Sequence, residues 1–141
     1  MLPSLLLLLL LLPAPALAGG TWEAEVVKVV DGDTIHVRRD SGELVKVRLW
    51  GVDCPELRNP WGPEAAEFTR VAALGRRVRV EVKGKPSRGR IVALVWIRKG
   101  VSLNHRLIWF GWAEWSRKYA PKEKAFQEAA ARAQIKNMGV K

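Results

Sequence analysis

Stretches in which apolar and charged residues alternate are the feature that most limits the fold of this chain. The clearest one runs from Arg77 to Lys83, where Val78, Val80 and Val82 are separated by charged residues. Because neighbouring side chains of a β-strand point to opposite faces, a period of two predicts a strand with one buried face. Similar patterns occur at 22–30, 35–38 and 45–49, and the apolar run 91–97 predicts a strand covered on both faces. About five strands are therefore expected.

The first predicted strand changes phase along its length. Trp22, Ala24 and Val26 alternate with charged residues, after which the apolar positions move to Val27 and Val29. A β-bulge, which adds one residue to one strand of a pair, produces such a shift. We therefore expect a bulge or a strong bend within this strand.

Three helices are predicted between and after the strands. The first begins near Pro63, which suits a first helical turn, and ends at Gly75. Ser102 can cap a second helix that ends near Gly111, and a third is expected from Pro121 to Gly139. Five strands in a curled sheet with about three helices predict a mainly β fold with α-helices (α+β), a Greek-key barrel of the OB type.

The charge balance predicts an anionic partner. The chain has 24 Lys and Arg against 14 Asp and Glu, which gives a net charge of +10. A surface of this kind binds nucleic acid without reading its sequence, because neutralising phosphates releases the cations condensed on them. Charge alone would also suit an anionic membrane or a polysaccharide, so the partner class rests on other residues.

Residues 1–18 have the pattern of a secretory signal peptide. Leu5 to Leu12 is a run of eight leucines, whereas a helix that crosses a bilayer needs about 20 apolar residues. Ala16-Leu17-Ala18 matches the small-x-small rule, so cleavage is expected after Ala18. The first residues carry no Lys or Arg, which leaves an uncleaved anchor or a misassigned start codon as alternatives. Residues 19–141 are expected to form one secreted or periplasmic domain, monomeric and without a transmembrane span.

The single cysteine, Cys54, cannot form a disulfide within the chain. A catalytic thiol needs a neighbouring base, and neither His36 nor His105 has a spacing to Cys54 that indicates such a pair. We therefore expect a free, half-buried thiol and a core that is stable without a covalent link.

The aspartates are few and lie close together in the sequence. Of four in the chain, Asp31, Asp33 and Asp53 fall at the ends of predicted strands, and Asp40 lies in a predicted turn. Asp-Gly between two strands is most often a hairpin turn, in which glycine supplies a positive φ angle. Two such strand ends can also bring carboxylates and a backbone carbonyl together, as a hard cation requires. The sequence therefore predicts a site for calcium, with magnesium as the competitor.

Two arginines and one glutamate accompany these aspartates. Arg48 lies on the strand face opposite Val47 and Leu49, so its guanidinium is expected to project from the core, where its planar fork suits phosphate oxygens. For Arg48 and for Arg90 the alternative is an exposed strand-edge charge. Glu56 follows Pro55, whose ring stiffens the loop, and its alternative is an ordinary solvated acid.

Four segments together resemble the thermonuclease family, typified by staphylococcal nuclease. They are Val30-Asp-Gly-Asp-Thr-Ile35, Arg48-Leu-Trp-Gly-Val-Asp-Cys-Pro-Glu56, Gly62-Pro-Glu-Ala-Ala-Glu-Phe-Thr69 and Gly89-Arg-Ile-Val-Ala93. The resemblance extends from about residue 22 to the carboxyl terminus. It implies an OB barrel, dependence on Ca²⁺, and cleavage of DNA and RNA, largely independent of sequence, to products that end in 3′-phosphate.

The resemblance also implies roles for individual residues. Asp33 and Asp53 match carboxylate ligands of calcium, Cys54 matches a position whose backbone carbonyl binds the ion, and Asp31 matches an acid that holds it through water. Glu56 matches the general base that activates the attacking water. Arg48 and Arg90 match two arginines that bind the phosphate, and Thr34 matches a residue that supports the turn.

The chain departs from the family at two places that contact the nucleotide. Pro86-Ser87-Arg88 stands where the family commonly has an acidic residue, a basic residue and a tyrosine, and of a pair of tyrosines only Tyr119 is kept. Arg88, Arg117, Lys118 and Tyr119 are the substrate-binding candidates that remain. Most of the seven tryptophans are assigned to the core and none to base stacking.

The combined set of site residues favours a secreted calcium-dependent nuclease. The alternative is a nucleic-acid-binding OB module whose catalytic activity has decayed. A weaker third possibility is a basic barrel that binds an anionic polymer of the cell envelope. A nuclease needs a base, an oriented water and positive charge near the phosphate oxygens, and the residues above supply these groups.

Overall fold

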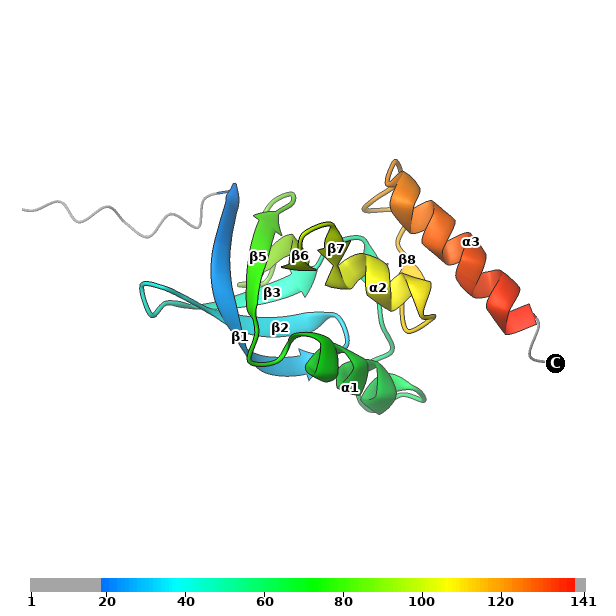
Figure 1. The fold of residues 1–141 in the computed structure, drawn as a ribbon, viewed down its shortest axis with the longest axis horizontal. Helices are drawn as coiled ribbons and strands as arrows, with labels where there is room; N and C mark the ends of the chain where they lie inside the picture. Colours follow the sequence, from blue (N-terminus) through cyan, green and yellow to red (C-terminus); the bar gives the residue numbers. More distant parts are fainter. Residues whose placement is uncertain (1–18, 139–141) are drawn as a thin grey trace, which may run out of the picture.

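The computed structural model describes residues 19–138, which form a β-barrel with helices packed around it (Figure 1). The long strands are β1 (Thr21–Asp31), β2 (Thr34–Arg39), β3 (Leu44–Leu49), β5 (Arg77–Val82) and β6 (Ile91–Arg98). The short strands are β4 (Val52–Asp53), β7 (Val101–Ser102) and β8 (Glu114–Trp115), and the helices are α1 (Gly62–Ala73), α2 (Leu103–Trp109) and α3 (Lys124–Met138). The predicted signal peptide, residues 1–18, lies outside the described residues.

The barrel closes through a parallel pairing of β3 with β6. The strands of the main sheet lie in the order β3-β2-β1-β5-β6-β7, and the pairs β1–β2, β1–β5, β2–β3 and β5–β6 are antiparallel. The β3–β6 contact joins the first strand of this order to β6, with Val47 opposite Ile91. The five long strands therefore form a closed barrel, and the predicted OB-type α+β fold is confirmed.

Most of the predicted elements are present, with small differences at their ends. A register shift in β1 between Val26 and Lys28 is the predicted bulge. Ser102 caps α2, since its hydroxyl accepts the N–H of His105 at 3.1 Å. The predicted start of the third helix at Pro121 is wrong, because a turn closed by the Glu123 N–H to the Ala120 carbonyl precedes α3. The two-residue strands were not predicted, since they are too short to show a period of two.

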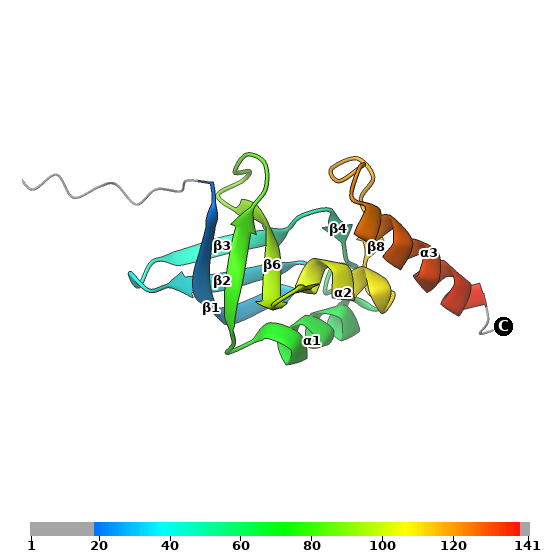
Figure 2. The same ribbon diagram turned by 45° about the horizontal axis from the view of Figure 1, so that its top comes forward.

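Valines from alternate strand positions fill the barrel, and α2 packs against it. Val26, Val37 and Val80 are fully buried, as are Leu103 and Leu107 of α2. Full burial of one such side chain contributes about 1.5–3 kcal/mol. Figure 2 shows α1 and α2 beside the barrel, with α3 farther from the strands. The core therefore lies inside the barrel and extends under α2.

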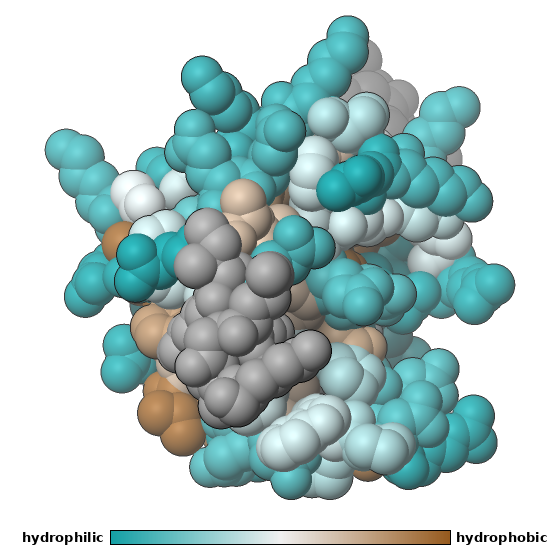
Figure 3. Space-filling model, turned by 90° about the vertical axis from the view of Figure 1, so that its right-hand side faces the viewer, coloured by the Kyte–Doolittle hydropathy of each residue, from teal (hydrophilic) through white to brown (hydrophobic). Residues whose placement is uncertain are grey.

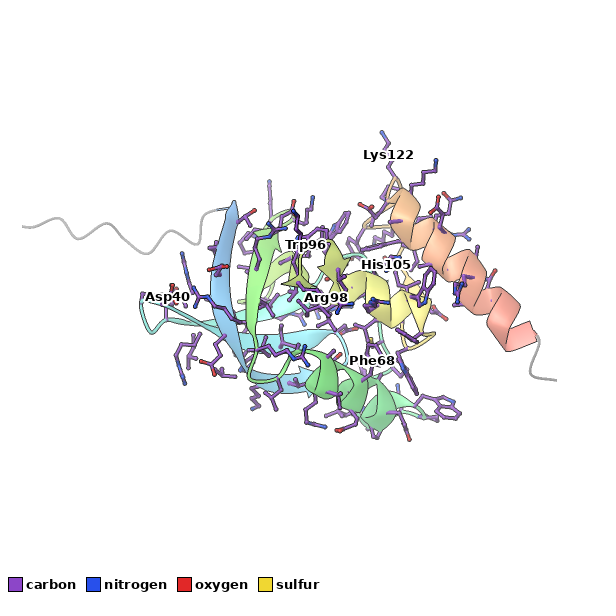
Figure 4. All side chains as sticks on the ribbon, in the orientation of Figure 1. Asp40, Phe68, Trp96, Arg98, His105 and Lys122 are labelled. Carbon is purple, nitrogen blue, oxygen red and sulfur yellow. The ribbon has the colours of Figure 1, made fainter. Side chains whose placement is uncertain are left out.

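Aromatic side chains join the helices. The ring of Phe68 on α1 lies 5.5 Å from that of Phe110 and 6.4 Å from that of Trp112, between α1 and the end of α2 (Figure 4). The assignment of the tryptophans to the core holds for the six that pack against it, which are Trp22, Trp50, Trp96, Trp109, Trp112 and Trp115. The exception is Trp61, which is 67% exposed. Within residues 19–138, no helix is both long and apolar enough to span a membrane.

Candidate active site

The turn between β1 and β2 carries the first two aspartates. Asp31 pairs with Thr34, which leaves Gly32 and Asp33 as a two-residue turn. The Asp33 N–H donates to Oδ1 of Asp31 at 3.1 Å, so the first carboxylate fixes the conformation that presents the second. The hairpin interpretation of Asp-Gly-Asp-Thr is therefore correct, and it is compatible with a functional role for the same residues.

Gly32 is required by close packing rather than by a positive φ angle, so the expected reason for this glycine was wrong. Its φ is not among the positive values of the described glycines. A Cβ at this position would lie 2.8 Å from Sγ of Cys54 and 3.1 Å from Cβ of Ala65. The absence of a side chain thus lets the β1–β2 turn contact the segment that follows β4.

Helix α1 holds the same turn from the other side. Oγ1 of Thr69 donates to the Gly32 carbonyl at 2.6 Å, and Thr69 is fully buried. A buried hydrogen bond without competing water fixes its partners more firmly than an exposed one. The Gly-Pro-Glu-Ala-Ala-Glu-Phe-Thr segment thus positions the carboxylates, although none of its side chains is a predicted ligand.

Asp33 is a buried carboxylate with several partners. The residue is 5% exposed, Oδ2 accepts the Cys54 N–H at 2.7 Å, and Oδ1 accepts the Thr34 hydroxyl at 3.2 Å. Burial raises the pKa of Asp33 to about 6, against the lowering effects of the Arg48 charge and the Cys54 N–H, and Asp31 raises it further. Burial disfavours the charged form of this carboxylate, and a nearby cation would stabilise that charged form.

Arg48 lies between the two predicted carboxylate ligands. Its Nη1 donates to the carbonyls of Leu49 and Val52, both at 2.9 Å. Its Nη2 lies 3.2 Å from Oδ2 of Asp33 and 3.5 Å from Oδ1 of Asp53. The guanidinium is thus oriented by backbone carbonyls, and the alternative of a free strand-edge charge does not describe it.

Asp53 differs from Asp33 in its surroundings. Its side chain is 71% exposed, and its β-strand partner in β8 is Glu114. The two aspartates come from segments 20 residues apart in sequence and meet on either side of one guanidinium. The structure therefore brings together the carboxylates that the sequence singled out.

The donor set suits a hard cation. Within the residues that the structure describes, no group of three or more His, Cys, Asp or Glu side chains could hold a metal ion. Two carboxylates are available, and one of them carries a pKa raised by burial. Calcium accepts backbone carbonyls and waters beside carboxylates, so the residues fit such an ion with the other positions filled by those oxygens.

Arg90 has an unused hydrogen-bond donor. It directly precedes β6, and its Nε is buried without a hydrogen-bond partner among the described residues. Buried donors of native proteins are nearly always paired, so this N–H is free to donate to a water or to a bound anion. Because Val47 faces Ile91 across the β3–β6 pair and both are buried, Arg48 and Arg90 occupy outward positions of neighbouring strands. Both arginines are thus available on one face of the barrel.

Glu56 is a predicted catalytic residue that makes its ion pair outside the group of Arg48, Asp33 and Asp53. Its side chain is 65% exposed and pairs with Nε of Arg58 at 3.4 Å. Among the described residues, no hydrogen bond or ion pair links it to Arg48 or Asp53. Its loop is closely packed, since a Cβ at Gly62 would lie 1.9 Å from the Glu56 carbonyl oxygen. The backbone of this loop is therefore constrained while the carboxylate reaches solvent.

The substrate-binding candidates lie in two places. Arg88 occupies the tight turn between Ser87 and Arg90 with a φ of 54°, next to the orphaned donor of Arg90. The other candidates are Arg117, Lys118 and Tyr119. They come shortly after β8, whose pairing with β4 brings them near Asp53. There the guanidinium of Arg117 lies 5.3 Å from the Trp115 ring, and Nζ of Lys118 lies 5.3 Å from the Tyr119 ring. Both groups of candidates thus adjoin predicted site residues.

A row of basic residues was missed by the sequence analysis. Lys28, His36 and Lys46 lie side by side on β1, β2 and β3, because Lys28 pairs with His36 and His36 pairs with Lys46. Burial lowers the pKa of His36, and the charges of Lys28 and Lys46 lower it further. Each lysine lies opposite His36, and because like charges placed opposite each other destabilise a sheet, the charged form of His36 is disfavoured. Only the strand register reveals this row, since the three residues are separated in the sequence.

The thiol of Cys54 has no sign of catalytic activation. The residue is buried, and burial raises the pKa of the thiol above its ordinary value, with a further rise from the charge of Asp33. A thiol is nucleophilic only as the thiolate. The expectation of a free cysteine without a catalytic role agrees with this environment, whereas the expected half-buried position is wrong, because Cys54 is only 8% exposed.

Comparisons with known proteins find similarity to nucleases. Residues 46–140 match the family described as staphylococcal nuclease homologue, a range that includes Arg48, Asp53, Glu56 and Arg90. A protein named thermonuclease from Staphylococcus hyicus is 36% identical over 118 residues, which cover 78% of this chain and 68% of that protein. An uncharacterized endonuclease of Haemophilus influenzae is 30% identical over 140 residues, 99% of this chain and 76% of the relative. Endonuclease YhcR of Bacillus subtilis is 31% identical over 146 residues, 91% of this chain but only 12% of that protein.

Proposed function

This chain belongs to the staphylococcal nuclease homologue family, and from that premise we propose that it is a calcium-dependent nuclease that cleaves DNA and RNA to products ending in 3′-phosphate. The family and the endonuclease relatives make it a phosphodiester-hydrolysing nuclease that acts on nucleic acid. The observation that carries the finer proposal is Arg48, held between Asp33 and Asp53 with the orphaned donor of Arg90 on the neighbouring strand.

The carboxylates of Asp33 and Asp53 and the backbone carbonyl of Cys54 would hold the calcium ion, and Asp31 would contact it through water. Support comes from the burial of Asp33 and from the close contact of its turn with Cys54. When bound, the ion supplies positive charge beside the phosphate whose bond is broken. Arg48 separates the two carboxylates in this structure, so its guanidinium would turn toward the phosphate in the complex.

Glu56 acts in this proposal as the general base. Its carboxylate takes a proton from a water molecule, the water oxygen bonds to phosphorus, and the bond to the 5′-oxygen breaks. The 5′-oxygen leaves with the electron pair of that bond and takes a proton from solvent water. An exposed carboxylate on a constrained loop can reach a water in front of the phosphate once it leaves Arg58. Arg48 and Arg90 bind the phosphate oxygens as their negative charge increases.

Replacing Arg90 by alanine is expected to reduce kcat by about 10²–10³-fold, which corresponds to about 2.7–4 kcal/mol of lost transition-state stabilisation, the usual effect of removing one such donor. Stability should change little, because the orphaned Nε makes no hydrogen bond that the fold would lose. Arg48→Ala should cause a similar loss of activity together with a lower melting temperature, since Arg48 also donates to two carbonyls.

The matched control is Arg98→Ala, an exposed arginine at the other end of β6 (Figure 4). DNA cleavage and thermal unfolding of the three variants provide the measurements. Equal losses of activity in Arg90→Ala and Arg98→Ala would show that Arg90 acts only through the net charge.

The basic row is proposed to bind phosphates of a long strand. Replacing Lys28 and Lys46 together by alanine should reduce the slope of log affinity against log salt by about two units on duplex DNA. The control replaces Arg98 and Lys99 by alanine. Arg98 ends β6 and Lys99 follows it, so this double variant removes the same charge far from the basic row. Fluorescence anisotropy at several salt concentrations measures the slopes, and identical slopes for the two double variants would contradict the assignment.

A second candidate function is a binding module without catalysis, and one observation favours it. Glu56 pairs with Arg58, and among the described residues no hydrogen bond or ion pair links it to Arg48 or Asp53. Digestion of DNA and RNA with calcium and with excess chelator separates the two functions. Cleavage that needs calcium supports the nuclease, whereas binding without cleavage supports the module.

The proposal extends to where the protein acts. Residues 1–18 would be a signal peptide removed after Ala18, and residues 19–141 would form a single secreted or periplasmic domain that works as a monomer. The supporting observations are the leucine run and the small residues that follow it.

A further inference from the structure

A cavity of about 930 Å³ adjoins the candidate active site, and the function proposed above assigns no ligand to it. It lies between the loop after β4, the segment around β8, and α3. Its lining includes Asp53, Trp61, Trp112, Trp115, Arg117 and Gln134. The end of the molecule that carries α3 is mostly hydrophilic, with apolar residues exposed among the polar ones (Figure 3). Its size lies in the range of cavities that bind small organic groups.

Trp61 lines this cavity in an unusual conformation. It is the residue before α1, and its φ of 67° and ψ of −2° place it in the left-handed region. Glycine and asparagine normally occupy that region, since other side chains are strained there. The Trp61 carbonyl accepts the Ala65 N–H at 3.0 Å, so the start of α1 fixes this backbone. A large apolar ring is thereby kept at the cavity, in a strained backbone of the kind found at ligand-binding sites.

The chemistry of the lining favours a flat, uncharged ligand. Tryptophan rings supply apolar faces, and the guanidinium of Arg117 lies over the Trp115 ring at 5.3 Å. Asp53 and Glu114 also line the cavity, against the single arginine Arg117, so the lining lacks the excess of positive charge that a phosphate site needs. Gln134 offers an amide that can donate and accept hydrogen bonds.

We propose that this cavity binds one nucleobase of the substrate strand, next to the phosphate that is cleaved, with the base stacked on Trp61. The inference rests on the proposed nuclease function, because it takes the strand to be held at Arg48. Asp53 belongs both to the candidate active site and to the cavity. Its Oδ1 lies 3.5 Å from Nη2 of Arg48, and the residue also lines the cavity. A nucleotide adjacent to the bound phosphate therefore reaches the cavity, while its own phosphates stay outside.

The test combines Trp61→Ala with a missing base. The substrate is a single-stranded oligonucleotide with one cleavable phosphodiester, in versions that lack the base on its 3′ side or on its 5′ side. Stacking of one base on an aromatic ring corresponds to about a tenfold change. Trp61→Ala should raise KM about tenfold on the intact substrate with kcat nearly unchanged. On one of the two abasic substrates the wild type should show the same loss, and the variant should lose nothing more.

Two further variants serve as controls. Trp61→Phe keeps an aromatic face and should retain most of the affinity. Val71→Ala removes another exposed apolar side chain, on α1 outside the cavity, and should behave as the wild type. The proposal would be overturned if the loss caused by Trp61→Ala multiplied with the loss caused by the missing base on both abasic substrates, or if KM were unchanged in Trp61→Ala.

A binding assay keeps this inference separate from the proposed function. Absence of cleavage by the wild type would refute the nuclease mechanism, yet anisotropy with the same oligonucleotides would still report on the cavity. Weaker binding by Trp61→Ala than by Val71→Ala, confined to substrates with the base present, supports the proposal. Equal binding by the two variants overturns it, as does a dimer in light scattering that only Trp61→Ala disrupts.

Discussion

Asp53→Ala is expected to abolish cleavage of DNA and RNA while leaving the protein folded. Its side chain is 71% exposed, and within residues 19–138 its one ion pair is the contact of 3.5 Å with Arg48, so the fold loses little. A calcium site built from two carboxylates, backbone oxygens and waters would be too weak with one of the carboxylates removed. Digestion at saturating calcium measures the activity, and thermal unfolding measures the stability.

Asp33→Ala should abolish cleavage equally but also lower the melting temperature. This carboxylate accepts hydrogen bonds from Cys54 and Thr34, and its removal leaves the buried Cys54 N–H without a partner. An unsatisfied buried donor costs about 1–3 kcal/mol. The two variants therefore share one functional defect and differ in stability.

The control for both variants is Asp40→Ala. Asp40 lies in the β2–β3 turn, at the other end of the molecule from α3 (Figure 4), and pairs with Arg77 at 2.9 Å. Its loss should leave cleavage unchanged. Excess chelator should inhibit the wild type as completely as Asp53→Ala does, and strong cleavage in chelator would refute the metal site.

Glu56→Gln is expected to lower kcat by about 10²–10⁴-fold, the range that a positioned general base contributes. Binding of calcium and of an oligonucleotide should be almost unchanged, because glutamine has the same shape and Glu56 is not a predicted ligand. Stability should also be unchanged, since the exposed pair with Arg58 contributes about 0–1 kcal/mol. Single-turnover kinetics separates the chemical step from binding.

The matched control for this variant is Glu64→Gln, an exposed acid in the first turn of α1. It removes the same charge eight residues away and should keep full activity. Turnover of Glu56→Gln near the wild-type value would remove Glu56 as the base. If binding also stayed intact, another group would have to activate the water.

The sequence by itself determined the local structure and the composition of the site. A period of two places Val78 and Val80 inside the barrel, because a strand can bury only alternate side chains. Ser102 marks the start of α2, because a hydroxyl can satisfy an N–H that the helix leaves free. The concentration of scarce aspartates at two strand ends identified the carboxylates that the fold then brings together.

Tertiary structure decided how these elements meet. Closure of the barrel through the β3–β6 pair brings Arg90, the residue before β6, next to the strand that carries Arg48, which no local pattern of the sequence specifies. The contact of Gly32 with Cys54 depends on packing between segments distant in sequence, and this contact, not a turn angle, explains the glycine. The strand register likewise determines the row of Lys28, His36 and Lys46.

Trp61 shows most clearly what composition could not reveal. An apolar ring is expected in the core, because its burial is favourable. The start of α1 instead holds its backbone at a positive φ and leaves the ring at the cavity beside Asp53. Sequence patterns report which residues can be buried, whereas the position of each residue depends on the space that the closed barrel and its helices leave for it.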